Sequence, residues 1–193
     1  MTIIIRAGEP GDAVALAGAF RRNREHLRPY EPERGAEFYT PEGQAERLRE
    51  AGAPQWFAVE ETCGGTGGGM GGETDGRPGG EPGRIVAGAR LSGIVRGPFR
   101  SASLGYWTDA EYTGRGLATA LVTEVCRAAR ETLGLHRIQA GTLLDNLASQ
   151  RVLARCGFER IGLAPRYLHI AGEWRDHYLH QRILHDDPPP AGY

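Results

Sequence analysis

The segment from Glu111 to Gly134, EYTGRGLATALVTEVCRAARETLG, constrains the fold most strongly, because a glycine turn opens directly into a helical pattern. Apolar residues recur there at steps of four, four and three, which predicts an amphipathic helix that buries one face. The first amides of a helix lack partners, and the helix dipole is positive at that end. The turn is therefore suited to bind an anion.

The rest of the chain reads as strands and helices in alternation, which is typical of an α/β fold with a mixed sheet. Runs rich in β-branched and aromatic residues predict seven strands. They are Thr2 to Ala7, Gln55 to Glu61, Arg84 to Val95, Ser101 to Asp109, His136 to Leu144, and two strands between Ala164 and Leu184 around the Ala171-Gly172 turn. Capping residues and helical spacing predict four helices. They begin near Asp12, Thr40, Gly116 and Asn146.

Residues 63–84 are dominated by glycine and have almost nothing to bury, which predicts a disordered loop between two antiparallel strands. A phosphate cradle is a poorer interpretation, because cradling glycines lead into a helix and these lead into a strand. The tail at 187–193 is predicted to be flexible. We therefore expect a single domain over residues 1–186.

Composition narrows the classes of function. A chain of 193 residues with 40% hydrophobic content can bury one core, and a net charge of -1 argues against binding to nucleic acid or a membrane. The amino-terminal apolar run is too short for a signal peptide, so we expect a cytoplasmic protein. Cys63, Cys126 and Cys156 lack CxxC spacing, which favours neither a disulfide framework nor a metal site.

Two common nucleotide-binding loops are excluded at the glycine turn. A Walker loop requires lysine, and the chain contains none. A dinucleotide fingerprint requires GxGxxG, and Thr119 stands where its last glycine would be. From the motif alone, two interpretations remain: a diphosphate held by backbone amides, or a glycine turn that simply starts a helix.

A second block downstream favours the diphosphate. LLDNLASQRVLARCGFERIG places Asn146 at a helix start, Ser149 one turn later and Gly157-Phe158 at the helix end. TGRGLATAL resembles motif A of the GCN5-related N-acetyltransferases (GNAT), and DNLASQRVLARCGF resembles the following segment in the branch with the ribosomal-protein N-terminal acetyltransferases RimJ and RimL. NREHLRPYEP and YLHIAGEWRDHYL extend the resemblance over the whole chain except the glycine insert and the tail.

The resemblance implies a single domain with a mixed, mostly antiparallel seven-stranded sheet flanked by about four helices. It implies direct transfer of an acetyl group from acetyl-CoA to a primary amine in a ternary complex, without a metal. The acceptor would be a peptide amino terminus or a small amine. Members of the family often dimerise, so a homodimer is a further expectation.

The resemblance also assigns the co-substrate site. Pantetheine would lie along the strand at Leu104, Tyr106 and Trp107, and Asn146 would hydrogen-bond it. Ser149 would protonate the departing thiolate. The pyrophosphate would bind the amides of the turn, which comprises Thr113, Gly114, Arg115, Gly116, Leu117 and Ala118. Thr113 departs from the family pattern, in which arginine or glutamine is usual, so a side-chain contact would be weaker there.

The general base is the least determined part of the site. A base is useful because most amines are protonated at neutral pH. In the ribosomal-protein branch an acidic residue often precedes the tyrosine of the penultimate strand, but here Arg166 precedes Tyr167. The base candidates are Glu25, His26, Asp176 and His177, each of which can equally be a surface or structural residue.

Tyr30 and Tyr167 are expected to line the acceptor pocket. The hydroxyl of Ser149 can also be explained without catalysis, as a first-turn serine that bonds Asn146 or the backbone. A non-catalytic acyl-CoA sensor with the same fold is the alternative hypothesis, and Arg166 in place of an acid supports it. Release of CoA in the presence of amines would separate the sensor from an enzyme.

Overall fold

The structure, a computed structural model, describes residues 2–61 and 83–189. Most of the predicted disordered loop at 63–84 therefore lies outside the described residues, as does the end of the predicted flexible tail. Arg84 is already the first residue of a strand. Residues 187–189 have no regular secondary structure.

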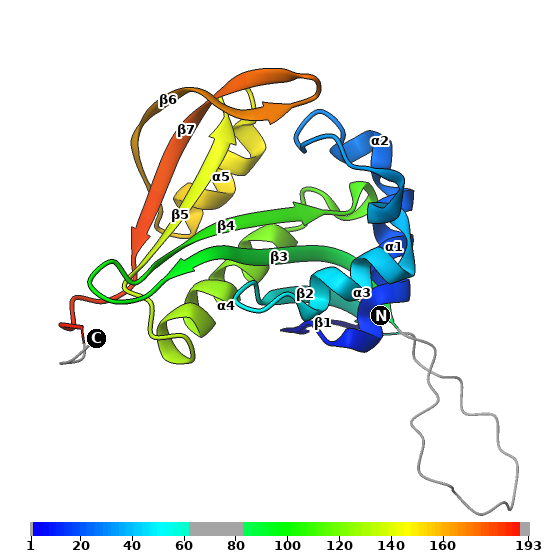
Figure 1. The fold of residues 1–193 in the computed structure, drawn as a ribbon, viewed down its shortest axis with the longest axis horizontal. Helices are drawn as coiled ribbons and strands as arrows, with labels where there is room; N and C mark the ends of the chain where they lie inside the picture. Colours follow the sequence, from blue (N-terminus) through cyan, green and yellow to red (C-terminus); the bar gives the residue numbers. More distant parts are fainter. Residues whose placement is uncertain (1, 62–82, 190–193) are drawn as a thin grey trace, which may run out of the picture.

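Seven strands form one sheet in the order β1-β2-β3-β4-β5-β7-β6 (Figure 1). The strands are β1 (Thr2–Ala7), β2 (Gln55–Glu61), β3 (Arg84–Val95), β4 (Ser101–Thr108), β5 (Arg137–Leu143), β6 (Glu159–Ile170) and β7 (Glu173–Ile183). Neighbours pair antiparallel except β4 and β5, which pair parallel. The predicted mixed, mostly antiparallel seven-stranded sheet is confirmed, although β6 begins at Glu159 rather than Ala164.

The described residues form five α-helices, one more than the sequence predicted. They are α1 (Ala13–Arg22), α2 (Arg24–Leu27), α3 (Pro41–Arg49), α4 (Leu117–Glu131) and α5 (Leu147–Arg155), with short 3-10 turns at Pro10–Asp12, Ala36–Tyr39 and Ala110–Tyr112. The additional helix is α2, a single turn that follows α1 and was not among the four predicted helices. None of the described helices is long and apolar enough to cross a membrane.

Asp12 does not cap α1 as its position suggested. Its carboxylate accepts two hydrogen bonds from the Arg6 guanidinium, at 2.6 and 2.8 Å, and one from the amide of Glu9. The predicted caps at Thr40 and Asn146 are present, because their side chains accept from the amides of Gly43 and Ser149. Asp12 therefore ties β1 to the turn before α1 instead.

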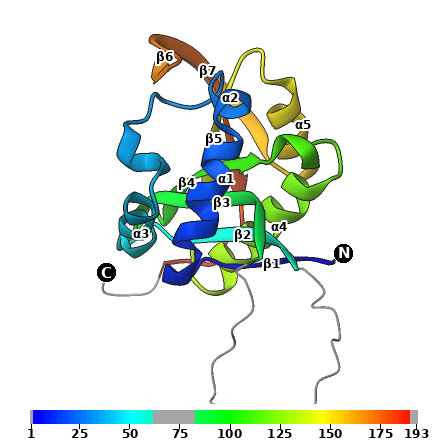
Figure 2. The ribbon, with the colours of Figure 1, turned by 90° about the vertical axis from the view of Figure 1, so that its right-hand side faces the viewer.

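Helices cover both faces of the sheet, and the side chains of β2 pack on both faces. Trp56 and Ala58 pack in the cluster beneath α4, whereas Phe57 and Val59 pack in the cluster beneath α1. Successive side chains of a strand point to opposite faces, so a strand buried on both faces is apolar throughout. In Figure 2, α1 and α3 lie on one side of β2 and β3, and α4 lies on the other.

The sheet splits between its two parallel strands. Pairing of β4 with β5 covers Ser101 to Ser103 and Arg137 to Gln139, where the described ladder ends. Beyond that point β4 stays paired with β3, and β5 stays paired with β7 (Figure 1). One backbone edge of β4, from Leu104 onward, is therefore free to bind a ligand.

Asp109 joins α1 to the end of β4. Its side chain is buried and accepts from the Arg22 guanidinium at 2.8 Å and from the amide of Glu111 at 3.1 Å. Arg84 adds a longer contact at 3.4 Å. Burial by itself would raise the pKa of this carboxyl, but donors from Asn23, Arg22 and the Glu111 amide outweigh it and lower the pKa.

Replacing Asp109 by asparagine should lower the free energy of unfolding by about 2–3 kcal/mol, the scale of charge-assisted hydrogen bonds. A carboxyl whose pKa is lower in the folded state stabilises the fold above its ordinary pKa of 3.8 and loses that contribution as the pH falls. The difference between wild type and variant should therefore be constant near neutral pH and shrink below about pH 4, as measured by urea unfolding.

The matched control is Asp145→Asn, which removes a carboxylate whose side chain is 71% exposed and 3.5 Å from Arg175. Exposed ion pairs contribute about 0–1 kcal/mol, so the control should unfold like wild type. An Asp109→Asn variant as stable as this control would contradict the structural role of Asp109.

Candidate active site

A cavity of ≈ 910 Å³ opens where β4 and β5 diverge. It is lined by β4, the turn before α4, the first turns of α5, parts of β6 and β7, and the segment that follows α1. Among the described lining residues there are five arginines and one carboxylate. The arginines are Arg34, Arg47, Arg90, Arg151 and Arg155, and the carboxylate is Glu31. The cavity is therefore suited to anionic ligands.

The glycine turn at one side of the cavity presents unpaired amides. Gly114 and Gly116 have φ angles of 74° and 77°, a left-handed conformation that favours glycine. The Thr113 amide donates to the Ala110 carbonyl, and the Ala120 amide donates to the Gly116 carbonyl. The backbone amides between these two have no acceptor among the described residues. A Cβ at either glycine would meet nothing within 4 Å. Backbone conformation, rather than crowding within the protein, requires glycine here.

Two side chains of the turn point elsewhere. The Thr113 hydroxyl donates to the carbonyl of Ala110 at 3.0 Å, which stabilises the preceding 3-10 turn. The Arg115 guanidinium stacks on the ring of Tyr112, 4.9 Å from its centroid, and Arg115 does not line the cavity. The other residues of the predicted set all line the cavity: Thr113, Gly114, Gly116, Leu117 and Ala118.

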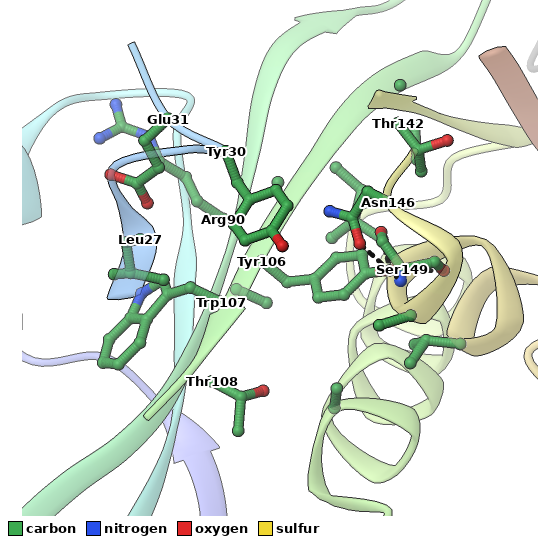
Figure 3. A pocket seen from close by; sticks show the side chains of 18 of the residues that line it. Leu27, Tyr30, Glu31, Arg90, Tyr106, Trp107, Thr108, Thr142, Asn146 and Ser149 are labelled. Atoms are coloured by element: carbon green, nitrogen blue, oxygen red, sulfur yellow. Dashed lines mark hydrogen bonds between the residues drawn. The ribbon is translucent and has the colours of Figure 1, made fainter. Parts of the chain in front are cut away.

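The first turn of α5 faces β4 across the cavity (Figure 3). The Asn146 side-chain oxygen accepts from the Ser149 amide at 3.0 Å, so this oxygen caps the helix while the amide nitrogen is left to donate to a ligand. The Ser149 hydroxyl lies 2.6 Å from the Tyr106 hydroxyl, which is also 3.1 Å from the Ser149 carbonyl. Both hydroxyls line the cavity together with Leu104 and Trp107.

The hydroxyl pair has two arrangements, because each group carries one hydrogen. When Tyr106 donates to the Ser149 hydroxyl, the hydrogen of Ser149 is free to point into the cavity. When Tyr106 donates to the Ser149 carbonyl, Ser149 can donate back to Tyr106. Burial raises the pKa of Tyr106 to about 12, so the tyrosine remains a donor at neutral pH.

The two tyrosines that were predicted to line the acceptor pocket both lie at the cavity. Tyr30 and Tyr167 line the cavity and are 47% and 44% exposed, so their rings are available to a ligand. The Tyr167 ring packs against His177, with 5.5 Å between centroids. Gly141 lies beneath this pair, since a Cβ there would come within 3.5 Å of both rings.

The base candidates are positioned unequally. Glu25 does not line the cavity and lies 3.7 Å from Arg28 on the surface, which removes it from the site. His26 lines the cavity but is exposed. His177 is buried and lines the cavity, and its Nδ1 lies 3.0 Å from the carbonyl of Arg175. A carbonyl only accepts, so Nδ1 carries the hydrogen and Nε2 of the neutral ring can accept a proton.

The backbone at Arg166 is strained. Arg166 has a φ of 50° within an irregularity of the β6 and β7 pairing, and its amide donates to Asp176 at 2.8 Å. Asp176 does not line the cavity, so it supports the turn that carries Tyr167.

Sequence reasoning missed the charged residues on the other side of the cavity. Glu31 is partly buried there; burial raises the pKa of its carboxyl, and the nearby Arg34 and Arg47 oppose that rise. Figure 3 shows Glu31 and Arg90 on the opposite side of Tyr106 from Ser149. The only local signal in the sequence is that Glu31 directly follows Tyr30, which was expected to line the acceptor pocket.

A family model described as an acetyltransferase (GNAT) domain matches residues 2–159. The chain belongs to the GNAT family. It is therefore an acetyltransferase, as the resemblance in its sequence predicted. Within the described residues, no group of three or more His, Cys, Asp or Glu side chains could hold a metal ion.

Relatives of the chain include a member of the predicted ribosomal-protein branch of the GNAT family. It is 31% identical to the ribosomal protein uS5-alanine N-acetyltransferase of Escherichia coli over 92% of this chain and 85% of that one. It is 32% identical to a probable N-acetyltransferase of Bacillus subtilis, YjcK, over 96% of both chains.

Solved structures agree with this placement. The ribosomal-protein-S5-alanine acetyltransferase of Vibrio fischeri matches with a TM-score of 0.83 at 32% identity, over 98% of this chain and 97% of that one. RimJ of Mycobacterium smegmatis, in complex with CoA-disulfide, matches with a TM-score of 0.74 at 27% identity, over 94% and 81%.

Proposed function

We propose that this GNAT protein transfers the acetyl group of acetyl-CoA to the amino terminus of a protein or peptide. The observation that carries the proposal is the turn of unpaired amides beside the free edge of β4, in one cavity. The amides of Gly114 to Ala118 would bind the pyrophosphate, and the β4 edge would bind the pantetheine arm. The relatives that act on an alanine of ribosomal protein uS5 support a peptide acceptor.

The proposed reaction is one direct transfer. The acceptor nitrogen attacks the thioester carbon, the C–N bond forms and the C–S bond breaks. The base takes a proton from the nitrogen, and the hydroxyl of Ser149 gives one to the sulfur. Ser149 regains its proton from Tyr106 or from solvent. His177 and Glu31 are the base candidates that best fit the geometry, since both line the cavity and both are less exposed than His26.

The cysteines support direct transfer over an acetyl-cysteine intermediate. Cys126 and Cys156 are free and buried, and neither lines the cavity. Burial raises the pKa of the Cys126 thiol to about 11, so little of the nucleophilic thiolate is present at neutral pH. Cys63 lies outside the described residues, and a Cys63→Ser enzyme should retain full activity.

The test is release of free CoA thiol from acetyl-CoA with a panel of acceptors. The panel contains peptides with amino-terminal alanine or serine, amino acids, polyamines and aminoglycosides, and the control is each peptide with its amino terminus already acetylated. We expect thiol release with free peptides and none with blocked ones. Release with small amines alone would redirect the proposal to a small-molecule acceptor. No release with any amine would favour the non-catalytic sensor.

A further inference from the structure

Three arginines, Arg34, Arg47 and Arg90, form a cluster on the side of the cavity opposite α5. We call them the arginine cluster. Arg34 follows α2, Arg47 lies on α3 and Arg90 lies on β3. The amide cradle and the hydroxyl pair belong to the β4, α4 and α5 side, so nothing assigned above uses these three charges.

The cluster is held in place by its neighbours. The guanidinium groups of Arg34 and Arg47 each stack on the ring of Phe38, 4.7 Å from its centroid. Arg90 is paired with Glu50, a carboxylate that is 57% exposed at the edge of the cluster. Stacking and pairing restrict these long side chains in advance, which reduces the entropy cost of binding a ligand.

The positive charge of the cluster is only partly compensated. Nε of Arg47 and one terminal nitrogen of Arg90, Nη1, are buried and have no hydrogen-bond partner among the described residues. Glu31 makes no ion pair within 4 Å in the described structure. Burial, with repulsion from Arg90 and Arg34, lowers the pKa of Arg47 to about 10, which leaves it charged at neutral pH. Buried donors without acceptors are costly, and an anionic ligand would relieve that cost.

The cluster lies close to the reacting region. Arg90 pairs across the ladder with Gly105, the residue before Tyr106, and paired strands are roughly 4.8 Å apart. Side chains at these two positions share one face of the sheet, and a Cβ at Gly105 would meet nothing within 4 Å. Because Gly105 has no side chain, a ligand has room to extend from the arginine cluster over Gly105 to the free edge of β4.

We propose that the acceptor carries a carboxylate close to its reactive amine, and that the arginine cluster binds this carboxylate. The inference rests on the proposed function and specifies its acceptor. A carboxylate matches the planar fork of arginine and would supply the acceptor that Arg47 and Arg90 lack. It has two sources: an acidic side chain near the amino terminus of a peptide, or the α-carboxylate of a free amino acid.

Matched acceptors test the proposal by thiol release. One pair is the peptide amides Ala-Glu-Ala-Ala and Ala-Gln-Ala-Ala, and the other is free alanine and alaninamide. We expect kcat/KM to be at least about tenfold higher for the acid in one pair, mainly through KM, because the contact is remote from the reacting atoms. The pair that shows the preference identifies the source of the carboxylate.

Variants connect the preference to the cluster. Arg47→Gln should reduce the acid preference to less than about threefold, while Arg47→Lys, which keeps the charge without the fork, should retain part of it. The control is Arg49→Gln, which removes an exposed charge from the same helix outside the cavity and should leave the preference unchanged. Thermal unfolding with acetyl-CoA verifies that each variant is folded and binds the donor.

Two outcomes would overturn the inference. Equal rates for acid and amide acceptors, or a preference for the amides, would show that the cluster does not bind an acceptor carboxylate, while the transfer activity itself would stand. An acid preference unchanged in Arg47→Gln would place recognition elsewhere. Absence of transfer to every acceptor would instead count against the proposed function.

Discussion

Replacing Gly116 by alanine should weaken acetyl-CoA binding about a hundredfold, as measured by calorimetry. Gly116 has a φ of 77°, and a side chain costs about 1–2 kcal/mol in this conformation. With alanine at this position, the turn without ligand can leave the left-handed conformation. Binding of acetyl-CoA must then restore that conformation, and its cost weakens the affinity. The new Cβ would also enter the open space that the phosphate oxygens are proposed to approach, where each charge-assisted hydrogen bond contributes about 1.5–3 kcal/mol.

Gly52 provides a matched control for this variant. It has a φ of 76°, and a Cβ there would also meet nothing within 4 Å, but it lies between α3 and β2 outside the cavity. Gly52→Ala should therefore cost about the same stability as Gly116→Ala and leave acetyl-CoA affinity unchanged. If both variants bind acetyl-CoA like wild type, the turn does not hold the pyrophosphate.

Elements with local signals were predicted well from the sequence. α3 has a Thr40 cap, a proline at its first position and a left-handed Gly52 beyond its end, and its observed start matches the prediction. The start of β6 was missed because this edge strand is exposed and has no clean alternation, with Pro165 in its middle. Because nearly all of its residues are exposed, the sequence lacks the alternation of apolar and polar residues by which a strand is recognised.

Sequence could place consecutive residues at the cavity, but it could not indicate residues that only the fold brings together. The turn from Thr113 to Ala118 is one continuous motif, so its place at the cavity followed from sequence. The arginine cluster joins residues 34, 47 and 90 from three elements, and no spacing in the chain announces it. The Tyr106 and Ser149 pair is likewise separated by 43 residues and depends on the packing of α5 against β4.

Removing the hydroxyl of Ser149 should lower kcat about a hundredfold with little change in KM for the acceptor, because a positioned acid contributes about 10²–10⁴-fold. Tyr106→Phe should lower kcat less, since it removes the partner that orients the serine rather than the proton donor itself. In the Tyr106→Phe, Ser149→Ala double variant the losses should not add, because the two hydroxyls act as one unit. Single-turnover thiol release measures the chemical step in all three variants.

Thr123→Ala is the control for loss of a hydroxyl. Its side chain bonds the Thr119 carbonyl within α4 and does not line the cavity, so kcat should be unchanged. The pH profile adds an independent readout: with a Tyr106 pKa of about 12, no loss of activity from tyrosine ionisation should occur below about pH 11. Full turnover in Ser149→Ala would remove the serine from the mechanism and leave thiolate departure to occur without an acid. Losses that add in the double variant would mean that Tyr106 acts on the substrate independently of Ser149.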